Sequence, residues 1–223
     1  MEPKLDVDFR VINDVGELYN FILNKIKIEV PNHLNNIVAC DVHYGEYAFV
    51  SCVLYDIKDR VMIEEVSVKS SILYSYKPGL FALREVPPIM DSLRRLYNKP
   101  DCIILDGHGI AHPKKAGLAC FVGVIYDIPA IGVAKSPLVG NFHIPCEDRG
   151  CWEPVYYKSE KVGEVVRTRS KTKPIFVSPG HRINFSASRN IVLNLVMKSK
   201  LPEPLRLAHL RAKSMAKLLK KGG

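Results

Sequence analysis

Apolar residues repeat with two different periods in the first third of the chain. Residues 14–28 carry them at helical spacing, behind an Asn-Asp pair of the kind that caps helices. Three runs rich in β-branched and aromatic residues follow, separated by tight turns, at 35–44, 46–56 and 60–70. The pattern predicts one helix and then three strands in an antiparallel meander.

The period changes again after the meander. Within residues 79–97 the apolar positions form a helical stripe at 82, 86, 89, 93 and 97. Pro87 and Pro88 interrupt this stripe, and because proline lacks the backbone N–H of a helical hydrogen bond, we expect the helix to bend or restart there. Short apolar runs at 102–106 and 129–135, with a helical segment between them, are typical of buried parallel strands.

The last part of the chain predicts further strands over 155–170 and 173–181, then helices at about 186–199 and 204–221. No repeat or linker separates these parts, so we expect one domain over residues 1–223. This element order indicates a ribonuclease H-like α/β fold, in which helices flank a mixed central sheet built from the meander and the parallel strands. The first and fourth strands of such a sheet are neighbours, and ligands gather at their carboxyl ends.

Two aspartates lie at those strand ends, because Asp41 closes IVACD and Asp106 closes CIILD. Adjacent carboxylates repel each other near a core unless a cation joins them. With no paired-histidine or thiol pattern nearby, the ion would be Mg²⁺, with Mn²⁺ as a substitute. Glu85 falls on the apolar side of the following helix, where an acid needs the same ion. Alternatively, each aspartate only ends a strand or caps a turn, and Glu85 pairs at the helix edge with Arg84 or Lys77.

Three further side chains are candidates for chemistry or binding, each with a structural alternative. Lys135 ends a buried strand, where its ammonium could meet a phosphate or carboxylate, or only reach solvent. His209 flanks the apolar stripe of the last helix and could be catalytic or structural. Tyr76 stands ahead of a Pro-Gly turn, where an aromatic ring could enter a base stack or pack on its own turn.

Charge favours a polyanionic partner. The formal net charge is +9 and the pI is about 9.2, which suits nucleic acid, although many basic proteins are merely soluble. After Glu203 the chain has no acid, so its last cations form either a phosphate-facing or a solvated surface: Arg206, Arg211, Lys213, Lys217, Lys220 and Lys221. A charged N-terminus and the lack of any apolar run near 18 residues predict a cytoplasmic protein with no membrane partner.

The six cysteines form no CxxC pair, and three of them lie in apolar runs, which predicts buried thiols. Cys146 and Cys151 flank a polar loop and could pair in an oxidising cell or a hyperthermophile.

Several motifs together resemble the endonuclease V family of deoxyinosine-directed repair nucleases. They are IVACDV, Tyr76 before Pro78-Gly79-Leu80, FALRE, LDGHGIAHP, IGVAKS, PIFVSPGH and PEPLRLAH, in that order. They cover roughly residues 37–219, and DGxGxAHP, GVAKS and SPGH together are highly specific.

The resemblance implies a Mg²⁺-dependent endodeoxyribonuclease that cuts the second phosphodiester bond 3′ to a deaminated base, leaving the lesion in the nicked strand. It implies three metal ligands, Asp41, Glu85 and Asp106, and adds Lys135 and His209 to the catalytic set. The DNA-binding residues would be Tyr76, which would act as a wedge, with Pro78, Gly79, Gly107, Gly109 and His112. The glycines after Asp106 would bring backbone amides up to a flipped base, where a side chain would block it.

Some positions depart from the family pattern, and other functions stay open. SYKP replaces the usual PYIP at the wedge, the hairpin after Asp41 is short, and Pro88 is an additional proline. The enzyme could also cut RNA that contains inosine, or recognise the structure of a nucleic acid rather than a base. The chain could instead be a nucleic-acid binding module without catalysis, although the intact acids argue against this. We expect a monomer that uses one or two ions.

Overall fold

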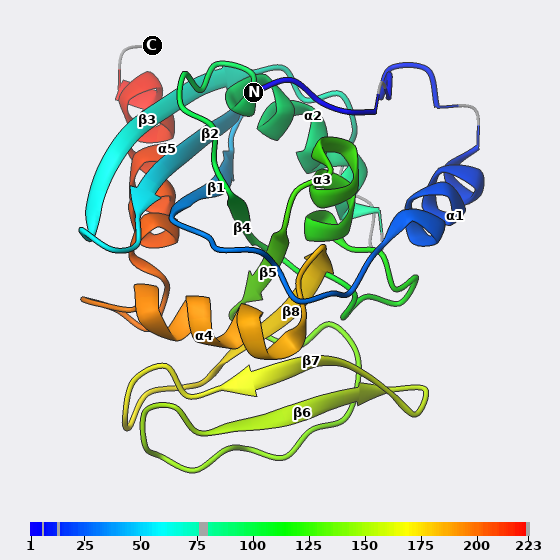
Figure 1. Ribbon diagram of the computed structural model, residues 1–223. Coiled ribbons are helices and arrows are strands. Elements are labelled where there is room, and N and C mark those ends of the chain that lie inside the picture. The colour runs from blue at the N-terminus through cyan, green and yellow to red at the C-terminus, as the bar shows by residue number, and fades with distance from the viewer. Residues whose placement is uncertain (6, 13, 76–79, 222–223) are drawn as a thin grey trace.

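The computed structural model describes the chain except residues 6, 13, 76–79 and 222–223. Its centre is a mixed sheet of eight strands in the order β3-β2-β1-β4-β5-β8-β7-β6 (Figure 1). The first three strands, β1 (Asn36–Tyr44), β2 (Ala48–Asp56) and β3 (Val61–Ser70), form the predicted antiparallel meander. Their order is set by the short turns between them, which leave each strand only its chain neighbour to pair with.

Parallel pairing joins the meander to the rest of the sheet. β1 lies beside β4 (Cys102–Asp106), with Cys40 opposite Leu105, and β4 lies beside β5 (Ala130–Ala134). The predicted contact of the first and fourth strands is therefore confirmed, and with it the ribonuclease H-like fold.

The later strands extend the same sheet. β8 (Ile175–His181) pairs antiparallel with β5, and the hairpin of β6 (Trp152–Tyr157) and β7 (Glu160–Val166) continues from it. The ends of β4 and β5, the start of β8 and the end of β7 consequently lie along one edge of the sheet.

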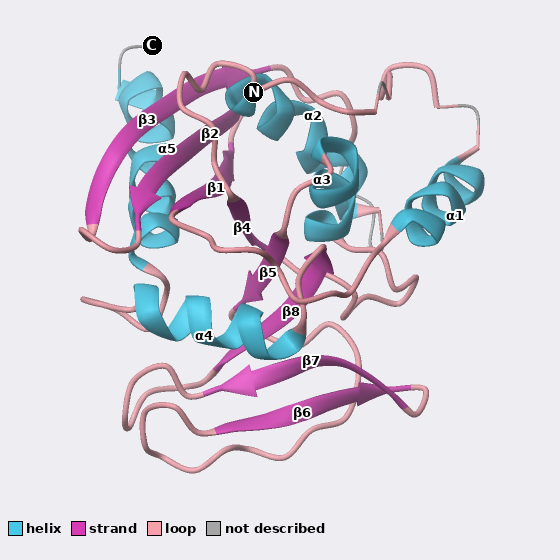
Figure 2. Cartoon of the chain, in the orientation of Figure 1, coloured by secondary structure: helices cyan, strands magenta, loops and turns pink. Residues whose placement is uncertain are grey.

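Five helices in the described part of the chain cover the sheet (Figure 2). They are α1 (Val15–Lys25), α2 (Phe81–Leu93), α3 (Leu118–Tyr126), α4 (Phe185–Leu195) and α5 (Glu203–Lys221). The Asp14 side chain caps α1 by accepting hydrogen bonds from the amides of Gly16 and Glu17. No described helix is long and apolar enough to cross a membrane.

Alternate residues of the central strands serve two separate cores. Val38 and Ile103 pack with α2 and α3, whereas Ile37 and Ile104 pack with α4 and the start of α5. Because successive side chains of a strand point to opposite faces, helices on both faces require strands that are apolar throughout. This explains why IVAC and CIIL read as continuous apolar runs.

The prolines do not restart α2, and one expected stripe position lies outside it. The helix is one continuous element through Pro87 and Pro88, so of the two expected outcomes, a bend or a restart, the restart is wrong, and Tyr97 lies beyond the helix with 93% of its surface exposed. Its buried side chains Val86, Ile89 and Leu93 hold it against the core on both sides of the prolines. Tertiary packing therefore outweighs the loss of the proline N–H donors.

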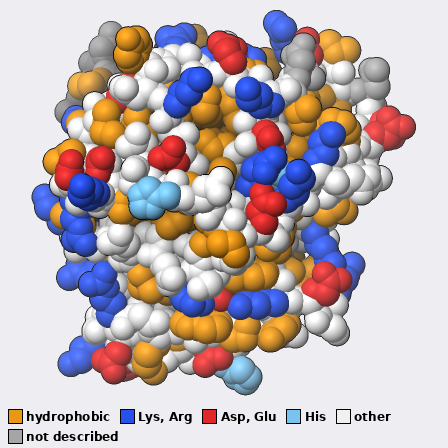
Figure 3. Space-filling view, in the orientation of Figure 1, with side chains coloured by type: hydrophobic (Ala, Val, Ile, Leu, Met, Phe, Trp, Pro, Cys, Tyr) orange, Lys and Arg blue, Asp and Glu red, His pale blue; other side chains and the backbone are white. Residues whose placement is uncertain are grey.

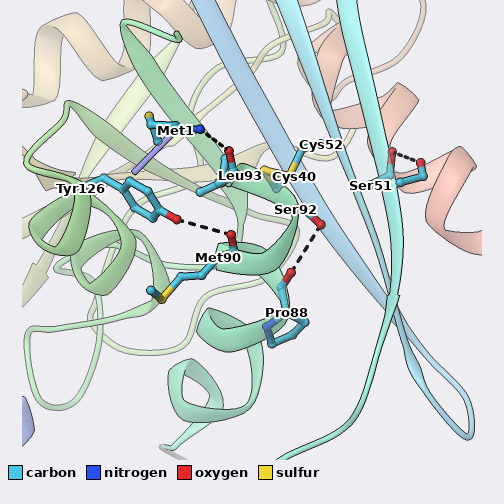
Figure 4. The surroundings of a disulfide bond; sticks show 10 residues. Met1, Cys40, Ser51, Cys52, Pro88, Met90, Ser92, Leu93 and Tyr126 are labelled. Carbon is cyan, nitrogen blue, oxygen red and sulfur yellow. Dashed lines mark hydrogen bonds between the residues drawn. A yellow bond between two sulfur atoms is a disulfide. The ribbon is translucent and has the colours of Figure 1, made fainter. Parts of the chain in front are cut away.

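The prediction of buried thiols is also wrong for one pair. Cys40 and Cys52 are buried, but they face each other across β1 and β2 and form a disulfide (Figure 4). Cys146 and Cys151 form a second disulfide, which closes the loop before β6. Cys102 and Cys120 are buried thiols, as predicted.

Candidate metal and nucleic-acid site

Three charged side chains lie where the parallel pairing of β1, β4 and β5 ends. Asp41 directly follows Cys40, the last β1 residue paired with β4, although β1 continues to Tyr44, so the expectation that Asp41 closes its strand is wrong. Asp106 is the last residue of β4, and Lys135 directly follows β5. The register of β1, β4 and β5 brings these ends to the same edge of the sheet. The topology therefore assembles residues that are 29 to 94 positions apart in the sequence.

The side chains at this edge make direct contacts. Oδ2 of Asp41 is 2.9 Å from Nδ1 of His209, and Nζ of Lys135 donates to Oδ2 of Asp106 at 2.8 Å. One ligand atom each from Asp41, Asp106 and His209 lies within 4.8 Å of the others. His209 reaches the strand because Ala208 and other small buried residues let α5 pack closely across β1 and β2.

Glu85 enters the site from α2, on the other face of the sheet. Its side chain is 5% exposed, so it is not an edge residue that reaches solvent. Burial raises its pKa well above the usual range, and the charges of Asp41 and Asp106 raise it further. For Asp41, burial and the charge of Asp106 raise the pKa to about 6, although His209 and Lys135 oppose this. The three carboxylates therefore have fewer cationic partners than their charge requires.

This donor set fits a divalent cation that prefers oxygen ligands. Carboxylates that converge near a core are costly to ionise, and Mg²⁺ or Mn²⁺ removes that cost while retaining waters and phosphate oxygens as other ligands. The coarse prediction of an acidic metal site is thus supported by the cluster of Asp41, Asp106 and His209. Glu85 is not part of that three-atom cluster, although it is near enough to feel both aspartates.

Tyr44 is a site residue that the sequence did not reveal. Its hydroxyl donates to the carbonyl oxygen of Arg84 at 3.3 Å and also lies next to Glu85, and the Arg84 guanidinium stacks 3.9 Å from its ring. In a regular helix the amide of residue 88 would bond that carbonyl, but Pro88 has no N–H. The proline thus frees an acceptor that holds the Tyr44 hydroxyl beside Glu85.

The glycine turn after Asp106 is packed tightly against β8. The amide of Gly109 donates to Oγ of Ser178 at 2.7 Å, and a Cβ at Gly109 would lie 2.0 Å from the carbonyl oxygen of Pro179. At Gly107 a Cβ would meet only the Leu118 side chain, at 3.3 Å. The close approach of β8 is therefore the physical reason for glycine at 109, and contact of this turn with a base stays a prediction.

His112 ends the turn in a buried position. It is 4% exposed and stacks on Tyr19 of α1, and its Nδ1 accepts a hydrogen bond from the amide of Lys114. Burial lowers its pKa to about 4, with smaller contributions from His108 and Lys114. In this arrangement His112 anchors the turn to α1, and its predicted contact with DNA stays a prediction.

Other predicted nucleic-acid contacts lie on α5 or outside the described residues. Tyr76, Pro78 and Gly79 fall in the part of the chain that is not described. On α5, Arg206 pairs with Glu203 and Arg211 pairs with Glu65, so part of its charge is neutralised within the protein.

Comparisons with known proteins agree on one family. The sequence model described as Endonuclease V matches residues 22–210. The chain is 34% identical over 207 residues to an Endonuclease V of Methanothrix thermoacetophila, covering 92% of each protein. The solved structure of Endonuclease_V from Bacillus subtilis matches at TM-score 0.95 and 27% identity over all of both chains. Ciona intestinalis Endonuclease V, in complex with a 24mer DNA containing an inosine followed by a ribo-adenosine, matches at TM-score 0.79 and 23% identity, covering 92% of this chain and 96% of that one.

Proposed function

The chain belongs to the endonuclease V family, and on this basis we propose that it nicks strands containing a deaminated base, chiefly deoxyinosine. The cut would fall at the second phosphodiester bond on the 3′ side and leave the lesion in the nicked strand. The observation that carries this proposal is the convergence of Asp41, Asp106 and His209 at one sheet edge, with Glu85 and Lys135 beside them. Residues 1–223 would act as one catalytic domain.

Asp41, Asp106 and Glu85 would hold Mg²⁺, with Mn²⁺ as a substitute. The ion would neutralise charge on the scissile phosphate and lower the pKa of a water. These three carboxylates would fix the position of the ion, because each is held by its own strand or helix. Such positioning supplies much of the rate gain expected for phosphodiester hydrolysis.

Lys135 and His209 would handle charge and protons around the phosphate. Nζ of Lys135 is tied to Asp106, which leaves its other N–H donors for a phosphate oxygen. Nδ1 of His209 faces Asp41, which leaves Nε2 to orient a water or donate to the leaving oxygen. Both side chains are held next to a carboxylate. The contribution of Lys135 to the cleavage rate should therefore depend on its charge, and that of His209 on the position of its ring.

Lesion recognition would rest on the turn after Asp106 and on the segment that carries Tyr76. Gly107, Gly109 and His112 would present backbone and ring atoms to the flipped base, while Tyr76, with Pro78 and Gly79, would fill the gap in the stack. Support comes from the Ciona intestinalis protein, which was crystallised with DNA containing an inosine. The same nucleic acid has a ribo-adenosine after the inosine, so a ribonucleotide strand is the main competing substrate.

The test is the cleavage of end-labelled duplexes that contain one inosine, with the cut mapped to the nucleotide. Matched DNA and RNA strands should be compared in Mg²⁺, in Mn²⁺ and with a chelator. We expect a nick directly after the 3′ neighbour of deoxyinosine, at the second phosphodiester bond, and only with a divalent ion. Preferred cutting of the RNA strand would instead establish the ribonuclease, and binding without any nick would establish a binding module.

The expected cellular setting is part of the same proposal: a cytoplasmic monomer whose partner is damaged DNA. Size-exclusion chromatography with light scattering tests the monomer, and fractionation of cells that express the tagged protein tests the location.

A further inference from the structure

A small pocket with two arginines lies away from the metal site. It has a volume of about 160 Å³ and is lined by Arg149, Arg169, Ser170, Val196 and Met197. Since a water occupies about 30 Å³ in the liquid, the pocket has room for a phosphate group and a few waters. Its walls come from three segments: the loop before β6, the β7–β8 connection and the α4–α5 connection.

The walls are held in place by a dense set of hydrogen bonds. Arg149 donates to the carbonyl of Leu193 at 2.8 Å, and its amide donates to Oγ of Ser170 at 3.0 Å. Arg169 donates to the carbonyl of Lys198 at 2.5 Å. These bonds use only part of each guanidinium, which has five N–H donors. The two arginines are therefore positioned in advance but still have donors to offer.

A buried arginine and a disulfide stiffen the same walls. Arg167 is 7% exposed and donates to the carbonyls of Pro145, Cys146 and Thr172, which ties two of the three segments together. The Cys146–Cys151 disulfide closes the loop that carries Arg149. A phosphate could thus bind with little ordering cost.

The pocket also carries charge without acidic partners. Arg182, Arg189 and Arg206 form ion pairs with carboxylates, whereas Arg149 and Arg169 form none within the described part of the chain. Residues 145–151, 167–173 and 196–202 together hold seven Lys and Arg against two acids, a formal charge of +5. In Figure 3, basic side chains gather along the left flank of the molecule, where Figure 1 shows the α4–α5 connection.

The pocket lies at the same sheet edge as the metal site. Ala134, which precedes Lys135, pairs with Phe176 of β8, and Ile175 pairs with Val166 of β7, just before Arg167. Lys173 and Lys200 lie in between, and burial followed by the charges of Lys173 and Lys135 lowers the pKa of Lys200. Cations therefore continue from Lys135 to the pocket.

We propose that the Arg149–Arg169 pocket binds a backbone phosphate of the substrate duplex, on the side of the cut away from the lesion. This rests on the proposed function for its substrate. In the sheet order, β3 lies on one side of β1 and β4, which carry Asp41 and Asp106, and β5, β8 and β7 lie on the other side. A strand that enters from the side of β3 and crosses the metal site therefore continues toward β7. Three strand spacings of about 4.8 Å separate β4 from β7, which is roughly four phosphates at about 3.4 Å of rise each.

The test compares Arg149→Gln/Arg169→Gln with Arg95→Gln/Lys99→Gln. The control removes the same charge from two exposed residues between α2 and β4, at the opposite sheet edge. Lys173→Gln/Lys200→Gln serves as a second variant, because neither side chain has a hydrogen bond among those described in this structure. Binding is measured on inosine duplexes whose 3′ arms end about two or about eight nucleotides beyond the cut, and on an undamaged duplex over a salt series.

For Arg149→Gln/Arg169→Gln we expect about tenfold weaker binding of the duplex with the long 3′ arm and a change within about twofold for the short arm. The slope of binding against salt should be smaller by about 1. The control variant Arg95→Gln/Lys99→Gln should bind like the wild type. The length of the 5′ arm should not change the affinity that Arg149→Gln/Arg169→Gln loses. Equal losses on both 3′ arms, a loss that follows the 5′ arm, or an unchanged salt slope would overturn the proposal. If the wild type shows no preference for inosine, the proposed function fails, and the undamaged duplex still decides the phosphate site.

Discussion

Carboxylates gather at both edges of the central sheet, but they are neutralised to different degrees. At the far edge, Asp127 accepts hydrogen bonds from Arg182 at 2.7 and 3.0 Å and lies 3.1 Å from His181, and these contacts, with Arg182 first, lower its pKa to about 2. At the edge with the candidate site, burial and Asp106 raise the pKa of Asp41 to about 6. The same residue type thus has opposite electrostatic environments.

This difference separates structural from functional acids. Arg182 also pairs with Glu29 and thereby fastens the segment between α1 and β1 to the sheet. Asp41, Asp106 and Glu85 instead repel one another, which costs stability in the protein alone. Residues that destabilise a fold and converge on one point are those expected to bind an ion or substrate.

The largest expected effect is on cleavage by Asp106→Asn. The amide keeps the shape of the side chain but removes a charge from the candidate metal site and the partner of Lys135, so activity in Mg²⁺ should fall at least a thousandfold. Asp127→Asn is the matched control at the other edge and should cleave like the wild type. Initial rates on an inosine duplex measure both. Comparable activity of the two variants would show that the acids at the candidate site matter no more for cleavage than Asp127 at the opposite edge.

A smaller loss is expected for Lys135→Met. The substitution keeps the length of the side chain but removes the ammonium beside Asp106, and loss of one such donor typically lowers the rate about a hundredfold. Lys158→Met, in the turn between β6 and β7, is the control. Single-turnover rates at saturating enzyme separate chemistry from binding; a normal rate with weaker binding would move Lys135 out of the catalytic set.

Asp41→Asn should raise thermal stability in the presence of a chelator. Its folded pKa of about 6 lies above the usual 3.8, so the folded wild type loses stability as pH rises from about 4 to about 6. The variant avoids this loss, on the order of 2 kcal/mol, and should melt about 5 °C higher at pH 7.5 but not at pH 4. A lower melting temperature at pH 7.5 would mean that the His209 contact outweighs the repulsion.

Asp127→Asn should have a small effect of the opposite sign. Its folded pKa of about 2 is below the usual 3.8, so its stabilisation is complete above about pH 4 and is lost as pH falls toward 2. Because the side chain is 47% exposed, solvent screening limits the effect to about 1 kcal/mol or less, or about 2 °C at pH 7. Asparagine tolerates the left-handed backbone at this position, so melting curves at pH 7 and pH 2.5 isolate the charge.

Much of the fold follows from local patterns. The meander, the switch to parallel strands and the contact of β1 with β4 could all be read from apolar periodicity and element order. That order also brought Asp41 and Asp106 together, since both directly follow the last residue pair of β1 and β4. The Cys40–Cys52 pair also follows from a local feature, because the short turn fixes the register of the β1–β2 hairpin and sets these two cysteines opposite each other.

Other features depend on packing between distant segments. No local pattern connects His209 to Asp41, which is 168 residues away, so only the family resemblance suggested it. The Tyr44 hydroxyl bonds the Arg84 carbonyl because Pro88 leaves that carbonyl without its helical partner. This contact exists only once β1 and α2 are packed together. The phosphate pocket likewise requires three connections to meet, and its arginines are unremarkable along the chain.

The most direct test of the central claim is a Mn²⁺ titration followed by electron paramagnetic resonance, without nucleic acid. Wild type, Asp127→Asn and the double variant Asp41→Asn/Asp106→Asn are compared at pH 7.5. We predict that wild type and Asp127→Asn bind Mn²⁺ with the same affinity, and that the double variant loses this binding while remaining folded. Undiminished Mn²⁺ binding by the double variant would contradict the assignment of the ion to this edge of the sheet.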